Sequence, residues 1–192
     1  MQELVLNPTH VSQWHALIDE AQQSVNCKLD EDLESYLVFL LIRFTTKPEI
    51  ANRILAMDYL ESLQQEGKQR LNNLKDVGDH CLIYSGLFPQ RATRRRVKIS
   101  YFVDLGRSAY REVSEHANNS IDLFQELAHS FVSLMDVLQS IRSLGNEQPC
   151  LEPLQAYDLW QETGSKHAYQ TLMKSSSGLP SSLIDMENNH KH

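Results

Sequence analysis

The chain of 192 residues is poor in cysteine, glycine, proline and long apolar runs, and each shortage argues against a class of protein. Its three cysteines, Cys27, Cys81 and Cys150, are odd in number and form no CxxC pair, which argues against disulfides or a zinc knuckle and favours a reducing compartment. Seven glycines and six prolines are too few for a collagen-like or low-complexity chain. The longest apolar run, Tyr36 to Ile42, is far shorter than the roughly twenty residues of a membrane-spanning helix.

Several functional motifs are absent as well. The N-terminal segment MQELVLNPTH has neither a basic stretch nor an apolar core, so we expect no secretory signal. The sequence contains no GxxxxGK[ST], GxGxxG, HExxH or GxSxG. Hydrophobic residues make up 41% and charged residues 22%, which is close to the composition of globular proteins. We therefore expect a globular protein of the bacterial cytosol that does not associate with membranes.

The periodicity that is present belongs to helices, and no segment alternates like a strand over more than a few residues. We expect helices over about 8–26, 31–45, 47–66, 69–85, 101–117, 121–143 and a shorter one over 153–162, followed by a last helical piece over 166–174. Gly86 is expected to end the fourth of these helices, and Ser100 to cap the fifth. The fold class is therefore all-α: one bundle of six or seven helices over residues 1–174, followed by a polar tail, residues 175–192, that we expect to be disordered.

Charge is distributed unevenly along the chain. Residues 87–111 hold seven basic residues and one acid, a net charge of +6, while the rest of the chain has 11 basic and 24 acidic residues, a net of −13. The basic residues are Arg91, Arg94, Arg95, Arg96, Lys98, Arg107 and Arg111. Guanidinium groups beside a helix N-terminus can bind an anion, so these residues are a candidate site for a phosphate or an acidic partner segment. The alternative is a solvated loop whose arginines pair with the acidic body.

A second candidate site consists of polar residues on otherwise apolar helices, because buried charges need partners. Its members are Glu34, Arg43, Asp79, His80, Glu112 and His116. Glu34 and Arg43 lie on the most apolar helix, where Arg43 aligns with Tyr36. His116 is expected on the inner face of its helix. For all six residues a structural salt bridge or hydrogen bond is the competing interpretation.

No catalytic residue, metal site or cofactor is predicted. The Glu126-x-x-His129 pair has the spacing of di-iron proteins, but both side chains point away from the apolar stripe of their helix, and no second such pair exists. Cys81 lies on an inner stripe and is expected to be a core thiol.

The sequence is compatible with three functions. The first is a non-enzymatic interaction protein that docks an acidic or phosphate-bearing partner on its basic segment. The second is a helical enzyme that binds a metal or cofactor at the internal carboxylate and histidine site. The third is an RNA-binding accessory protein, which the acidic net charge of −7 disfavours.

Overall fold

The computed structural model describes residues 8–46, 55–116, 121–145 and 150–176. These residues form helices and no strand, which confirms the all-α class. The described helices are α1 (Pro8–Ser24), α2 (Glu31–Thr46), α3 (Leu55–Leu63), α4 (Gly67–Leu87), α5 (Gln90–Arg94), α6 (Ile99–His116), α7 (Ile121–His129), α8 (Phe131–Leu144), α9 (Pro153–Thr163) and α10 (Lys166–Ser176). None of them is both long and apolar enough to cross a membrane.

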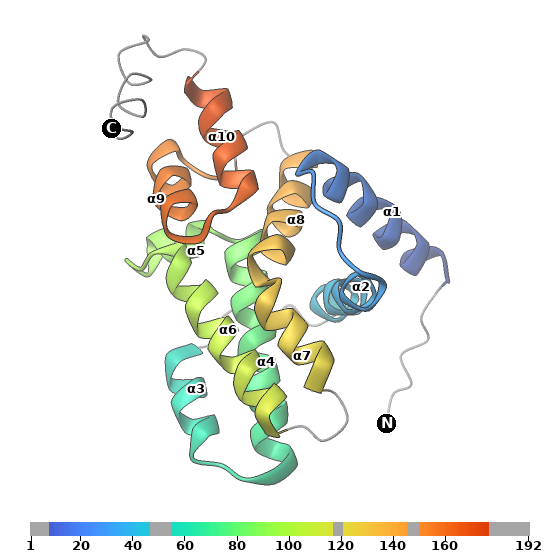
Figure 1. Ribbon diagram of the computed structural model, residues 1–192, viewed down its shortest axis with the longest axis vertical. Helices are drawn as coiled ribbons and strands as arrows, with labels where there is room; N and C mark the ends of the chain where they lie inside the picture. The colour runs from blue at the N-terminus through green and yellow to red at the C-terminus, as the bar shows by residue number, and fades with distance from the viewer. Residues whose placement is uncertain (1–7, 47–54, 117–120, 146–149, 177–192) are drawn as a thin grey trace, which may run out of the picture.

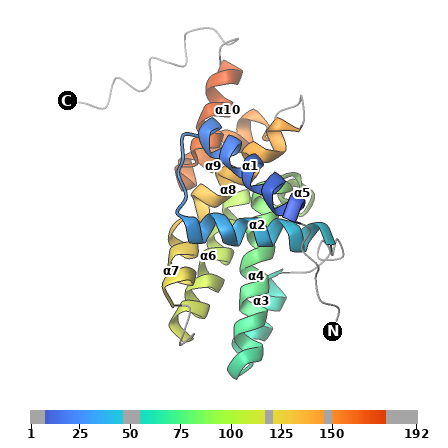
Figure 2. The same cartoon turned by 90° about the vertical axis from the view of Figure 1, so that its right-hand side faces the viewer.

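Helices α4, α6 and α8 form the centre of the molecule (Figure 1). α7 packs on α6 and α3 packs on α4, while α9 and α10 pair with each other at the opposite end. α1 lies against α8 and α2, and Figure 2 shows α2 running across the long axes of the central helices. The middle of the core is therefore α4, in which every residue from Val77 to Gly86 is buried, and not the apolar helix α2.

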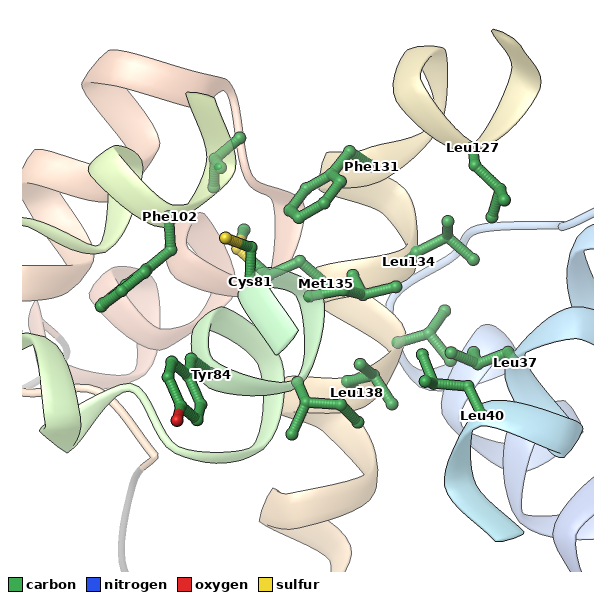
Figure 3. Close-up of a cluster of buried hydrophobic side chains, with 14 of the residues drawn as sticks. Leu37, Leu40, Cys81, Tyr84, Phe102, Leu127, Phe131, Leu134, Met135 and Leu138 are labelled. Carbon is green, nitrogen blue, oxygen red and sulfur yellow. The ribbon is translucent and has the colours of Figure 1, made fainter. Parts of the chain in front are cut away.

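The central helices approach one another closely because glycines face large side chains (Figure 3 shows the surrounding core). A Cβ atom on Gly106 of α6 would lie 2.5 Å from the ring of Phe131 and 2.8 Å from Cβ of Cys81. A Cβ atom on Gly86 of α4 would lie 2.5 Å from Leu138. Both spaces are already filled by side chains of the neighbouring helix, so α6 and α4 can pack this closely only with glycine at these positions.

The expected count of six or seven helices was wrong, because the described residues contain ten. One difference arises at Ser130, which divides the expected helix 121–143 into α7 and α8. Arg107 of α6 donates from Nε to the carbonyl of Ala128 at 3.0 Å, and its guanidinium also reaches the carbonyl of His129 at 3.5 Å. At the break, the carbonyls of Ala128 and His129 therefore accept hydrogen bonds from a side chain of α6. The local sequence does not reveal this interaction.

Two further expectations about helix ends were wrong. Gly86 does not end α4, which runs on to Leu87, because the glycine is needed there for close packing rather than for a turn. Ser100 does not cap a helix, since α6 begins one residue earlier and the Ser100 hydroxyl donates to Glu162. By contrast, Pro153 opens α9 as expected, and Gly164 ends it in the left-handed conformation with φ of 72°.

Other expectations fall on parts of the chain that the structure does not describe. The expected helix 47–66 is represented by α3, and its first residues, 47–54, lie outside the described residues. The last helix continues to Ser176, and residues 177–192 of the expected tail also lie outside the described part.

Candidate functional site

The basic segment after α4 folds into the short helix α5 and a turn, rather than into an open loop. Two of its arginines stack on the ring of Tyr84, which is 1% exposed: Arg91 lies 5.0 Å and Arg95 5.7 Å from the ring centre. Burial raises the pKa of the Tyr84 hydroxyl, and the two arginines oppose that rise. We call residues 88–98, which join α4 to α6, the connector. The stacking anchors α5 to the core and fixes the direction in which the connector presents its charges.

Arg94 and Arg96 follow on the outside of the turn, where both side chains are exposed. Within the described part of the chain, neither forms an ion pair with a carboxylate. Arg96 has a φ of 56°, the left-handed conformation that turns the chain toward α6. Two guanidinium groups thus remain available to a partner in solution.

Lys98 is engaged differently. Its ammonium group forms an ion pair with Glu162 of α9, which also accepts the hydroxyl of Ser100. These hydrogen bonds raise the pKa of Lys98 and lower the pKa of Glu162. Lys98 therefore ties the start of α6 to α9 instead of contributing a free positive charge.

A cavity of about 270 Å³ lies between this connector and α9. Its apolar wall consists of Ala92, Val97, Ile99 and Leu159, and its polar rim includes Thr93, Arg96, Gln155 and Asp158. The Gln155 amide donates to the Thr93 hydroxyl across the rim. Leu154, one turn before Asp158 on α9, is 73% exposed. The Arg96 side chain thus lines the hollow, and the exposed Leu154 precedes the rim residue Asp158 by one helical turn.

The remaining two members of the basic candidate site lie further along α6. Arg107 is bound to the carbonyls at the α7–α8 junction, as described above. Arg111 is exposed, and a helical rise of about 1.5 Å per residue places it roughly 18 Å from the start of α6. The seven basic residues therefore do not form one continuous surface.

The structure brings together two of the six internal polar candidates, Arg43 and Asp79, with two tyrosines. Asp79 is 2% exposed, and its Oδ1 accepts the hydroxyl of Tyr36 at 2.6 Å and that of Tyr110 at 2.7 Å. Its Oδ2 accepts from the Arg43 guanidinium at 2.5 Å, and Arg43 also lies 3.5 Å from Asp76. The network joins α2, α4 and α6 through side chains alone.

The charge of Asp79 also acts on its donors. Burial, followed by the nearby Asp79 carboxylate, raises the pKa of Tyr36 and Tyr110 well above the ordinary value, so both stay protonated as donors. Burial lowers the pKa of Arg43, but the charges of Asp79 and Asp76 outweigh this effect and raise it overall. Asp79 is therefore bound by one guanidinium and two neutral hydroxyls, and the guanidinium also lies beside Asp76.

The other four internal candidates lie elsewhere. Glu34 pairs with His15 of α1 at 2.8 Å, and His80 is buried beside the ring of Tyr84. Glu112 pairs with Arg70 at 2.8 Å. His116, expected on an inner face, is instead exposed and bonds through Nδ1 to the carbonyl oxygen of Glu112 at 2.9 Å, because α6 ends there.

One group of potential metal ligands occurs at that end of α6. Ligand atoms of Glu112, Glu115 and His116 lie within 4.8 Å of one another. The two residues nearest the helix end are exposed, and Arg70 already neutralises Glu112. This arrangement matches a solvated helix end, and we assign no metal to it.

A second buried carboxylate, Asp136, was not predicted from the sequence. It is 3% exposed and accepts the Ser165 hydroxyl at 2.5 Å and the backbone N–H of Lys166 at 2.8 Å, so it caps the start of α10 from α8. Burial raises its pKa to about 6, although these hydrogen bonds act in the opposite direction. Burial, with a smaller effect of Lys174, lowers the pKa of neighbouring His167 to about 4. The only signal in the sequence is Asp136 itself, a single acid on an apolar helix.

The cysteines offer no reactive site in the interior. All three are free, and burial raises the pKa of the Cys81 thiol far above its ordinary value and that of Cys150 to about 11. Cys81 packs in the core, which confirms the expectation from its position on the inner stripe.

The fold and these sites define an all-α protein with a basic connector on its surface and a carboxylate network in its interior. No family model matches the chain, and no curated protein and no solved structure shows significant similarity to it.

Proposed function

We propose that the protein is a non-enzymatic interaction protein that docks an acidic segment of a protein partner on its connector surface. We define this surface as Arg94, Arg95, Arg96 and Leu154 together with the cavity that Arg96 lines. The observation that carries the proposal is the pair of exposed guanidinium groups, Arg94 and Arg96, which meet no carboxylate within the described residues. Arg96 also lines a partly apolar hollow.

The connector is built to hold its shape before a partner arrives. Stacking of Arg91 and Arg95 on Tyr84 anchors α5, and the Lys98–Glu162 ion pair joins the other end of the connector to α9. A surface ordered in advance loses less conformational entropy on binding. A partner segment with acidic residues can pair with the exposed arginines while an apolar side chain enters the hollow beside Leu154.

Two features favour a protein segment over a nucleic acid. One wall of the cavity is apolar, formed by Ala92, Val97, Ile99 and Leu159, so the cavity suits a hydrophobic side chain of a protein segment better than a phosphate backbone. Arg107 and Arg111 lie too far along α6 to extend a phosphate track from the connector. The enzyme alternative has less support, because its six residues do not converge on one site: Arg43 meets Asp79, while Glu112 and His116 lie together at the end of α6.

The test is a capture experiment on native lysate of the source organism, carried out with and without nuclease treatment. Arg94→Gln/Arg96→Gln removes two exposed charges, and Lys68→Gln/Arg111→Gln removes the same number from exposed positions outside the connector surface. We expect wild type and the control pair to retain one stoichiometric protein partner, and Arg94→Gln/Arg96→Gln to lose at least about tenfold of it, more so at low salt.

Three outcomes would contradict the proposal. They are equal capture by both double variants, loss of the partner on nuclease treatment, and recovery of the protein alone. Circular dichroism of each variant would show that the helical fold is unchanged, so that a loss of capture reports on the surface and not on folding.

A further inference from the structure

A second cavity, of about 390 Å³, opens where α2 crosses α4 and α7, away from the connector surface. It is lined by Tyr36, Phe39, Leu40, Arg43, Lys75, Asp79, Leu123 and Phe124. Figure 2 shows the crossing, in which α2 lies over the middle of α4. Its volume falls within the range of about 300–1,000 Å³ that is usual for small-molecule sites.

The charged groups at the floor of this cavity, Asp79 and Arg43, already have partners. Asp79 accepts three hydrogen bonds, from Tyr36, Tyr110 and Arg43. The Arg43 guanidinium divides its charge between Asp79 and Asp76. The floor therefore offers a ligand neither an unpaired carboxylate nor an unpaired guanidinium.

One charged side chain of the lining, Lys75, pairs with no carboxylate among the described residues. The ammonium group of Lys75, one turn before Asp79 on α4, lies 5.6 Å from the centre of the Tyr36 ring. Among the residues that the structure describes, no carboxylate lies within ion-pair distance of Lys75. The side chain is half-buried at the cavity, so a ligand anion there would meet a single, partly desolvated positive charge.

The walls are aromatic and aliphatic. Phe39 is 53% exposed although it lies on the most apolar helix, and Phe124 is 8% exposed. The rings of Tyr36 and Phe124 pack nearly perpendicular to each other, with the ring centres 6.3 Å apart. A planar aromatic ligand placed here would cover Phe39 and remove its apolar surface from water.

We infer that this cavity binds a small aromatic carboxylate, with the carboxylate on Lys75 and the ring against Phe39 and Phe124. A monoanion matches the one unpaired ammonium group. A phosphate dianion fits less well, because phosphates are usually held by several guanidinium or backbone N–H groups, and Arg43 is already bound to two carboxylates. The inference does not depend on the connector surface, since the two cavities share no residue.

The experiment is a calorimetric titration of the full chain with 1-naphthoate, the neutral 1-naphthalenemethanol and the cationic 1-naphthylmethylamine. Lys75→Gln removes the charge at nearly constant length, and Phe39→Ala removes an exposed ring, so neither change empties the core. Lys68→Gln, an exposed lysine in the first turn of the same helix, is the matched control.

We expect naphthoate to bind wild type and Lys68→Gln equally. Lys75→Gln should weaken the binding by about tenfold, the usual scale of a hydrogen bond to a charged group, and Phe39→Ala by several-fold. The neutral analogue should bind wild type about as weakly as naphthoate binds Lys75→Gln. Arg94→Gln/Arg96→Gln should bind naphthoate like wild type, which separates this result from the proposed docking.

Any of four results overturns the inference. They are no binding of naphthoate at millimolar concentration, unchanged affinity in either pocket variant, equal affinity for the neutral analogue, and tighter binding of the cationic amine.

Discussion

Two buried carboxylates, Asp79 on α4 and Asp136 on α8, are stabilised by different kinds of partner. Asp79 is neutralised by a guanidinium and two tyrosine hydroxyls that come from two other helices. Asp136 receives a serine hydroxyl and backbone N–H groups at the start of one helix, and no guanidinium of the described residues contacts it. The first carboxylate joins three helices through charge, and the second caps one helix end, with a pKa raised by burial.

The comparison predicts that losing Asp79 has the largest effect on stability. Asp79→Ala leaves Arg43 without its closest partner and two tyrosine hydroxyls without acceptors. We expect the free energy of unfolding to fall by about 3–5 kcal/mol, because two hydroxyls each lose an acceptor at about 1–3 kcal/mol. Arg43 adds less to the loss, because its side chain is 36% exposed and still lies beside Asp76. Urea denaturation followed by circular dichroism measures it. A loss below about 1 kcal/mol would show that the network does not hold α2 in place.

The Asp136 region predicts an unusual pH dependence. Asp136 binds its proton more tightly when folded, so its contribution to stability is full below its ordinary pKa of 3.8 and is lost as pH rises through about 6. His167 binds its proton more weakly when folded, so its contribution is full above 6.5 and is lost as pH falls through about 4. The two slopes are opposite and largely cancel in the wild type.

Single variants should separate these slopes. Between pH 4 and 6.5, the unfolding free energy of Asp136→Asn should rise relative to wild type, and that of His167→Gln should fall, each by about 3 kcal/mol. Denaturation curves at several pH values give these differences, and other titrating groups cancel in the comparison with wild type. Parallel curves for the three proteins would contradict the assigned pKa shifts.

The hydroxyls of the two tyrosines in the Asp79 network should contribute unequally to stability, and each should contribute less than Asp79 itself. Tyr110 is completely buried, so Tyr110→Phe leaves Oδ1 of Asp79 with one donor fewer and no access to water, at a cost of about 1–3 kcal/mol. Tyr36 is half-buried beside the cavity, where water can replace its hydroxyl, so Tyr36→Phe should cost about 1 kcal/mol or less. Equal losses in urea denaturation would mean that water does not reach Asp79 from the cavity.

The sequence predicts the helices well and their partners poorly. Period and turn residues locate α1, α2 and α9 because those signals are local, and Pro153 and Gly164 act where they stand. The break at Ser130 depends on Arg107, more than twenty residues earlier, so no local pattern contains it. Likewise, Gly86 resembles a helix end until Leu138 is seen to fill the space above it.

The site residues show the same difference between signals that are local in the sequence and contacts between distant residues. Alignment of Arg43 with Tyr36 on one face of α2 is visible in the sequence, and both residues do bind Asp79. Tyr110 carries no such signal, because its role depends on how α6 packs against α4. The connector was recognisable from its charge, but only the structure separates Lys98 and Arg107, which have protein partners, from the exposed Arg94 and Arg96.

The most direct test of the proposed docking is site-specific photocross-linking in cells. A benzoylphenylalanine introduced at the exposed position of Leu154 lies beside the connector, and one at exposed Gln125 on α7 serves as the control. The account predicts a discrete protein adduct from position 154 that is absent from position 125 and disappears with Arg94→Gln/Arg96→Gln. No adduct from position 154, a nucleic-acid adduct, or the same adduct from both positions would contradict it.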